Sequence, residues 1–167
     1  IKIGLDPKLH TKKSLNFFFS KTNCKLISID QNLINKLWLK KKHYNINSFY
    51  ILPKKVVGND YLSKIKKLAG VLIKKKIDIQ FLTASENIAW LLNIRGKDSD
   101  FSPIPNSYLI VDSNKKVNLF CDLKKINNSF KKNLKDIKIL DIKKTSFFLS
   151  KIRNKKISID SSTCSLF

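Results

Sequence analysis

Hydrophobic residues recur at three- and four-residue steps between positions 61 and 75, which places them on one face of a helix. The members of this face are Leu62, Ile65, Leu68, Ala69, Leu72 and Ile73. Asn59 and Asp60 stand directly before it as candidates for the N-terminal cap. The pattern predicts an amphipathic helix whose lysines face outward.

Alternation of apolar and polar residues predicts strands elsewhere. Residues 77–81 alternate in this way, and segments 108–111 and 117–121 flank the turn sequence DSNKK as the strands of a hairpin do. Further strands are predicted at 1–6, 24–29, 137–142 and 157–160, and helices at 85–92, 123–134 and 144–153, with Thr11 and Ser85 as additional helix caps. Residues 32–38 are predicted as a short helical or coiled piece. Strands and helices interleave, which predicts an α/β domain with a mixed sheet, parallel where helices cross over and antiparallel at the hairpin.

The segment from residue 85 to 111 concentrates residue types that are rare in this chain. The whole sequence has four glycines, four prolines and two arginines. This segment alone contains Trp90, Arg95, Gly96, Pro103 and Pro105. Such a concentration predicts a shaped turn between two regular elements, and makes this segment the first place to look for a functional site.

Two interpretations of the turn remain open from the residues themselves. Gly96 permits a positive φ or a close approach of the backbone, while Asp98 and Asp100 are able to pair with Arg95 or to accept backbone N–H groups. Arg95 is therefore either the centre of an ion pair that fixes the turn or a functional residue. Trp90 lies on a short amphipathic helix and is expected to pack inward.

The formal net charge of +22 is a possible signal for a nucleic-acid partner, because basic surfaces attract polyanions. The basic residues are nearly all lysine, however, whereas specific phosphate and base recognition draws heavily on arginine. Lys, Asn, Ile and Phe are all abundant and share AT-rich codons, so a mutational bias explains much of the charge. We expect no specific nucleic-acid partner and keep a lysine-rich nucleic-acid-binding module as the alternative function.

Residues for catalysis or metal binding are sparse. The histidines are His10 and His43, each beside lysines, and the cysteines show no CxxC spacing. We expect local capping around His10, exposure of His43, no catalytic or metal-ligating residue, and no cofactor in this segment. Without a long apolar run or a signal segment, we expect no membrane contact and a cytoplasmic location.

Three sequence motifs in order resemble a known family. They are IGLDPKLHT at the start, QNLINKLW at 31–38, and ENIAWLLNIRGKDSDFSPIPNSYLIV at 86–111. The chain resembles the second domain of three-domain Xaa-Pro aminopeptidases, also called aminopeptidase P, over almost its whole length. That domain shows a VDP-like start, an NLVD-like stretch ending in Trp, and an IAWLxNLRGxD segment followed by Pro and SYAxV.

The resemblance implies a creatinase/prolidase N-terminal-like fold with a mixed sheet of about six strands flanked by helices. It implies a parent enzyme that hydrolyses the bond between an N-terminal residue and proline, using two divalent metals, usually manganese, in a C-terminal pita-bread domain. The family's ligands, two Asp, one His and two Glu, are expected outside this chain. We therefore expect residues 1–167 to form a single non-catalytic domain, a fragment of a longer polypeptide that is inactive alone.

The resemblance also implies a role for the turn. Asn93, Arg95, Gly96 and Asp98 correspond to the NLRGxD loop, which implies a domain-contact or substrate-cleft site. The implied partners are the catalytic and first domains of the same polypeptide, a peptide substrate with proline second, and, as an option, a second copy in a homodimer. Lys97 stands where a small Ser is common, and Lys8 replaces a frequent aromatic residue.

Overall fold

The computed structural model describes residues 1–38 and 47–166. The predicted exposure of His43 lies outside the described residues. The chain divides into two compact units, one formed by Ile1–Tyr44 with Asp160–Phe167 and the other by Asn45–Ile159. The single domain expected for residues 1–167 stays a prediction.

The smaller unit begins as a β-α-β arrangement. Strand β1 (Lys2–Leu5) pairs in parallel with β2 (Lys25–Ser28), and α1 (Lys12–Phe19) connects them. Thr11 caps α1 as predicted, because its side chain accepts a hydrogen bond from the Ser14 backbone N–H and Ser14 Oγ accepts one from the Thr11 N–H. The short helix α2 (Leu33–Leu37) follows β2.

Local capping is also present before α1. The Asp6 carboxylate accepts hydrogen bonds from the Lys8 backbone N–H at 2.9 Å and from Asn32 Nδ2 at 3.1 Å. These bonds, first the one from the Lys8 backbone, hold the pKa of Asp6 below its usual value. The acidic residue of the DPKLH stretch therefore braces its own loop.

The larger unit contains a five-stranded mixed sheet of order β8-β7-β6-β4-β9. Its strands are β4 (Ile79–Leu82), β6 (Ser107–Asp112), β7 (Val117–Cys121), β8 (Ile137–Asp141) and β9 (Ile157–Ser158). The β6–β7 hairpin and the β4–β6 pair are antiparallel, whereas β7–β8 and β4–β9 are parallel. The predicted mixed α/β architecture, with parallel strands at the crossovers, is confirmed.

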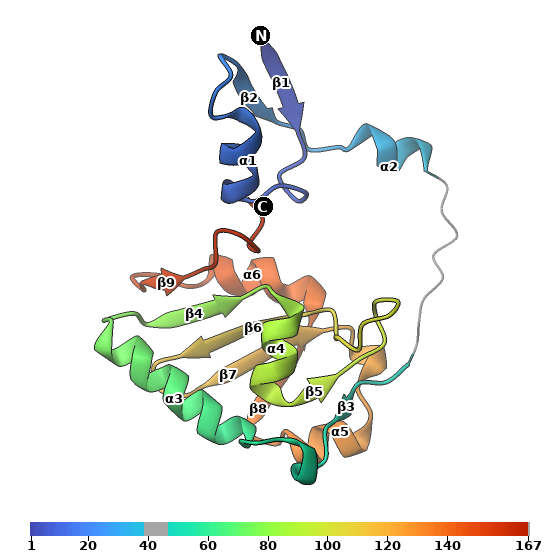
Figure 1. Ribbon diagram of the computed structural model, residues 1–167, viewed down its shortest axis with the longest axis vertical. Coiled ribbons are helices and arrows are strands. Elements are labelled where there is room, and N and C mark those ends of the chain that lie inside the picture. The colour runs from blue at the N-terminus through green and yellow to red at the C-terminus, as the bar shows by residue number, and fades with distance from the viewer. Residues whose placement is uncertain (39–46, 167) are drawn as a thin grey trace. The chain divides into compact units, whose positions relative to one another are not determined.

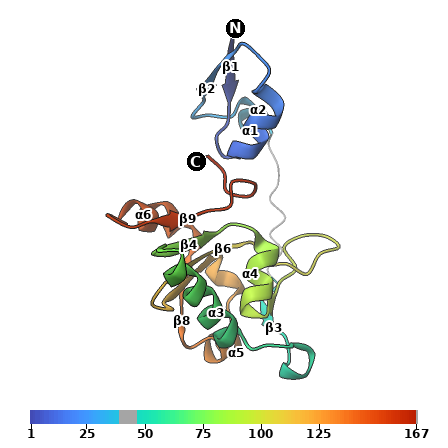
Figure 2. The same cartoon turned by 60° about the vertical axis from the view of Figure 1, so that its left-hand side comes forward.

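Helices cover both faces of this sheet (Figure 1 and Figure 2). The core contains Leu109 and Leu119 from one face, packed with residues of α3 (Tyr61–Lys74), α4 (Ser85–Leu92) and α5 (Asn128–Asn133). Phe120 points to the other face because side chains alternate along a strand. Its ring packs edge-on against that of Phe148 in α6 (Thr145–Ser150), with the two ring centroids 5.3 Å apart. The sheet is therefore the middle layer of the unit.

One predicted helix is divided in the structure. The helix predicted at 123–134 is split into a 3-10 turn, η2 (Leu123–Lys125), and α5. The split occurs because the Asn127 side chain accepts a hydrogen bond from the Phe130 N–H at 2.8 Å and starts a new helix there. Two further 3-10 turns are η1 (Lys54–Val56) and η3 (Ile142–Lys144).

A separate two-stranded ribbon, β3 (Tyr50–Ile51) with β5 (Ile94–Arg95), was not predicted. Each strand has two residues, too few to show an alternating pattern. The antiparallel pairing places Arg95 opposite Tyr50. In the described part of the chain, no helix is both long and apolar enough to cross a membrane.

Candidate functional site

The candidate site begins where α4 ends. Asn93 terminates this helix with φ 57° and ψ 31°, in the left-handed region that Asn tolerates better than most residues. The chain then enters β5 without a longer connection. The start of α4 differs from the prediction, because the N-cap is Ala84 and Ser85 is already helical.

Asn93 is also a buried junction between three segments. Its side-chain Nδ2 donates a hydrogen bond to the Asn59 carbonyl at 2.9 Å, and its Oδ1 accepts one from Lys64 Nζ. Its backbone carbonyl accepts a hydrogen bond from the Leu52 N–H at 2.9 Å. One residue thus connects the end of α4 to α3, to the segment before α3, and to the chain that follows β3.

Lys64 contradicts the expectation that the lysines of α3 all face outward. Lys64 is only 8% exposed, and its Nζ donates hydrogen bonds to the Trp90 carbonyl and to Asn93 Oδ1. Burial, with a smaller contribution from Arg95, lowers the pKa of Lys64. Apolar periodicity missed this residue because it lies on the flank of the helix that faces α4.

Trp90 is 63% exposed, so the prediction that it packs inward is wrong. The buried face of α4 is formed by Ile88, Ala89, Leu91 and Leu92. At 100° per residue these positions lie on the side of the helix opposite Trp90. The indole ring instead covers Lys64, whose Nζ lies 4.3 Å from the ring centroid.

Arg95 binds the end of α4 rather than an aspartate. Its NH1 group donates to the Ala89 carbonyl at 3.2 Å and to the Ile94 carbonyl at 2.8 Å. A cation at a helix C-terminus satisfies carbonyl groups and complements the helix dipole. The predicted partner Asp98 forms an ion pair with Lys125 and accepts a hydrogen bond from the Asn106 N–H at 2.7 Å.

Gly96 occupies a position where a side chain has no space. A Cβ atom there would lie 2.9 Å from Pro105 Cα and 3.1 Å from the ring of Phe49. Its N–H donates to the Pro103 carbonyl at 3.2 Å. The predicted close approach of the backbone is confirmed, whereas the alternative, a positive φ at Gly96, is not adopted.

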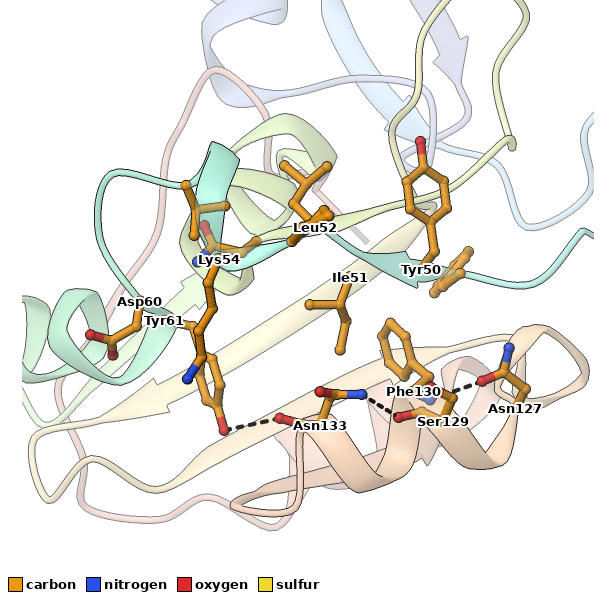
Figure 3. A pocket seen from close by; sticks show the side chains of 14 residues that line it. Tyr50, Ile51, Leu52, Lys54, Asp60, Tyr61, Asn127, Ser129, Phe130 and Asn133 are labelled. Atoms are coloured by element: carbon orange, nitrogen blue, oxygen red, sulfur yellow. Dashed lines mark hydrogen bonds between the residues drawn. The ribbon is translucent and has the colours of Figure 1, made fainter.

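A cavity of about 400 Å³ lies between the β3 segment and α5 (Figure 3). Ile51, Tyr61 and Phe130 line its apolar part, and Asn93 also borders it. On its rim, Asn133 Nδ2 donates to the Ser129 carbonyl at 2.9 Å. Arg95, Gly96 and Asp98 do not line this cavity, so the four predicted site residues form a braced loop rather than one pocket.

The described residues do not fit a metal centre. Within ranges 1–38 and 47–166, no three His, Cys, Asp or Glu side chains form a group that could hold a metal ion. Burial raises the pKa of the Cys121 thiol to about 12, so this cysteine stays protonated and unreactive near neutral pH.

Comparison with known proteins identifies the family. The model of the creatinase/prolidase N-terminal domain matches residues 40–167. The chain belongs to this family. The match includes the whole larger unit, while most of the smaller unit precedes it.

Similar proteins include Xaa-Pro aminopeptidase 1 from Dictyostelium discoideum, 33% identical over 80% of this chain and 23% of that protein. Xaa-Pro aminopeptidase ApepP from Drosophila melanogaster is 32% identical over 90% of this chain and 26% of that protein. The chain spans about a quarter of the length of these curated relatives. The resemblance inferred from three sequence motifs is confirmed.

A solved structure agrees with the fold. X-prolyl aminopeptidase from Caenorhabditis elegans, described as a cytosolic enzyme with a dinuclear active site, superposes with a TM-score of 0.81 at 25% identity. The superposition covers 89% of this chain and 25% of that one. The creatinase/prolidase N-terminal-like fold is therefore supported by sequence and by structure.

We expect opposite effects from the same substitution at two glycines. Gly96→Ala should lower the free energy of unfolding by about 1–3 kcal/mol, because its Cβ would meet the Pro105 backbone and the Phe49 ring. Gly70→Ala should raise it by about 0.5–1 kcal/mol, because Gly70 lies inside α3 with open space around it. Urea denaturation followed by circular dichroism measures both. Equal shifts at the two positions would contradict the close packing of Gly96.

A second pair of variants isolates the buried junction. Asn93 and Asn154 both have positive φ, 57° and 54°, so alanine strains the backbone at either position. Asn93→Ala also removes the hydrogen bonds to Lys64 and Asn59, which adds about 1–3 kcal/mol of destabilisation. Thermal unfolding should therefore show a larger loss for Asn93→Ala than for Asn154→Ala. A loss of equal size would show that the buried hydrogen bonds add nothing.

Proposed function

We propose that this chain is a non-catalytic part of an Xaa-Pro aminopeptidase, which releases an N-terminal residue from peptides with proline in second position. The observation that carries the proposal is the alignment of 80–90% of the chain with Xaa-Pro aminopeptidases at 32–33% identity. The ordered motifs around Arg95 support the same conclusion.

We assign the hydrolysis of the peptide bond to residues outside this chain. In the parent enzyme, two divalent metals, with manganese as the expected ion, would belong to a separate catalytic domain. A metal centre of this kind activates a water molecule and polarises the scissile carbonyl. The donor set of the described residues does not fit such a centre, so no chemical step is assigned to this chain.

The role that we assign to the loop from Asn93 to Asp98 is positioning. Buried hydrogen bonds fix Asn93, close packing fixes Gly96, and an ion pair fixes Asp98. Arg95 also fixes the loop, because it donates to the Ala89 carbonyl of α4 and to the Ile94 carbonyl of β5. A loop held at four of its six residues is suited to present a constant surface to a neighbouring domain, either as a contact or as a wall of its substrate cleft.

The parent activity can be tested with matched peptides. The full-length protein should release the first residue from a peptide with proline second, and should lose this activity when a chelator removes its metals. A peptide with alanine in place of proline should be a poor substrate, and the 167-residue chain alone should release nothing. Cleavage by the isolated chain, or equal cleavage of both peptides, would overturn the proposal.

The role of Arg95 can be tested against the other arginine. Arg95→Ala in the full-length enzyme should lower kcat/KM by about tenfold, the effect of ~1.4 kcal/mol of lost positioning. Arg153→Ala is the control, since Arg153 is exposed and also donates to a backbone carbonyl, that of Ile152. Both variants are assayed well below their unfolding temperatures. Unchanged kinetics in Arg95→Ala would show that Arg95 only caps α4 and has no positioning role in the enzyme.

A further inference from the structure

The loop between β5 and β6 carries Phe101, an exposed aromatic residue with a positive φ. In Figure 1 and Figure 2 this loop extends away from the sheet of the larger unit. It is braced at its base by the ion pair between Asp98 and Lys125 and by the Gly96 to Pro103 hydrogen bond. Nearer its tip, Ser99 and Ser102 form an antiparallel bridge. Contacts therefore tie the loop at its base and also near its tip.

Phe101 lies in the sequence between the two bridged serines, and it is fully solvent-exposed, with a relative accessibility of 109%. Its φ is 62°, in the left-handed region where a bulky aromatic residue is a genuine outlier. Exposure of the ring and strain of the backbone both disfavour this arrangement. A residue held in strain by well-determined surroundings is a recognised mark of a functional position.

Other exposed phenylalanines of the chain differ from Phe101. Phe147 is 65% exposed and has Lys151 Nζ at 5.0 Å from its ring centroid, while Phe17 contacts the ring of Phe18 at 5.2 Å. Within the described residues, Phe101 makes no aromatic or cation–π contact. Phe101 itself borders an open hollow of about 390 Å³, whose other lining residues are Lys97, Ser99, Asp100, Ser102 and Pro103.

We propose that Phe101 is an anchor that inserts into an apolar pocket on the catalytic domain of the same polypeptide. Buried aromatic anchors of this kind dominate the energy of protein interfaces. The hollow beside the ring would receive a side chain of the partner in return. This inference rests on the proposed function, because it places the partner surface in the part of the enzyme that this chain does not contain.

Charge and length favour this occupant over a second copy of the chain. Two copies that each carry a net charge of +22 repel one another. The solved C. elegans enzyme is about four times as long as the matched part, since the superposition covers 25% of it. Most of the surface available for contact in such an enzyme thus belongs to other domains.

Photo-cross-linking in the full-length protein tests the anchor. Phe101→p-benzoylphenylalanine should give, on irradiation, an intramolecular cross-link to a peptide beyond residue 167, identified by mass spectrometry. Phe147→p-benzoylphenylalanine is the matched control and should not give that cross-link. No cross-link from position 101, a cross-link between two copies, or the same cross-link from both positions would overturn the proposal.

The cross-link also separates this inference from the proposed function. If the full-length protein fails to cleave Xaa-Pro peptides but position 101 cross-links to a later domain, the aminopeptidase assignment fails and the anchor stands as a domain contact. If cleavage occurs as proposed without the cross-link, the enzyme assignment stands and the anchor fails.

Discussion

The larger unit depends on how the chain reverses at Asn93. A helix that ends on a left-handed residue leaves polar groups that must be satisfied when the end is buried. Here the Asn93 side chain and the Lys64 ammonium group satisfy each other together with the carbonyls of Asn59 and Trp90. Because the hydrogen bonds reach α3 as well as α4, the two helices and the start of β5 are fixed by one network.

The network has an electrostatic consequence. Lys64 is buried beside Arg95, so two cations are close together at one helix end. This arrangement is tolerated because both donate to carbonyl groups, whose negative ends converge at the C-terminus of α4. The indole of Trp90 lies over the ammonium group and adds a further favourable contact. Helix polarity therefore performs here the role that a carboxylate performs in an ordinary ion pair.

The sequence predicted the elements that bury apolar residues at regular intervals. The helix α3, which follows Asp60 in the sequence, and the hairpin of β6 and β7 are examples. The periodicity of their apolar residues directly indicates burial on one side. It failed where tertiary contacts decide the outcome. The partners of Arg95 and Asp98, the burial of Lys64 and the exposure of Trp90 depend on which helix end and which loop meet in space. The spacing of residues along the chain does not specify which helix end and which loop come into contact.

The candidate site consequently has two parts with different physical roles. Asn93, Gly96 and Asp98 are engaged within the domain, so a change at any of them alters the shape and stability of the loop first. Phe101 exposes aromatic surface whose burial would contribute free energy only in contact with a partner. Stability measurements on this chain therefore report on the first group, whereas a binding measurement is needed to report on Phe101. An exposed aromatic ring on a loop whose base is tied in this way would bind a partner at a smaller cost in loop ordering than a ring on an unconstrained loop.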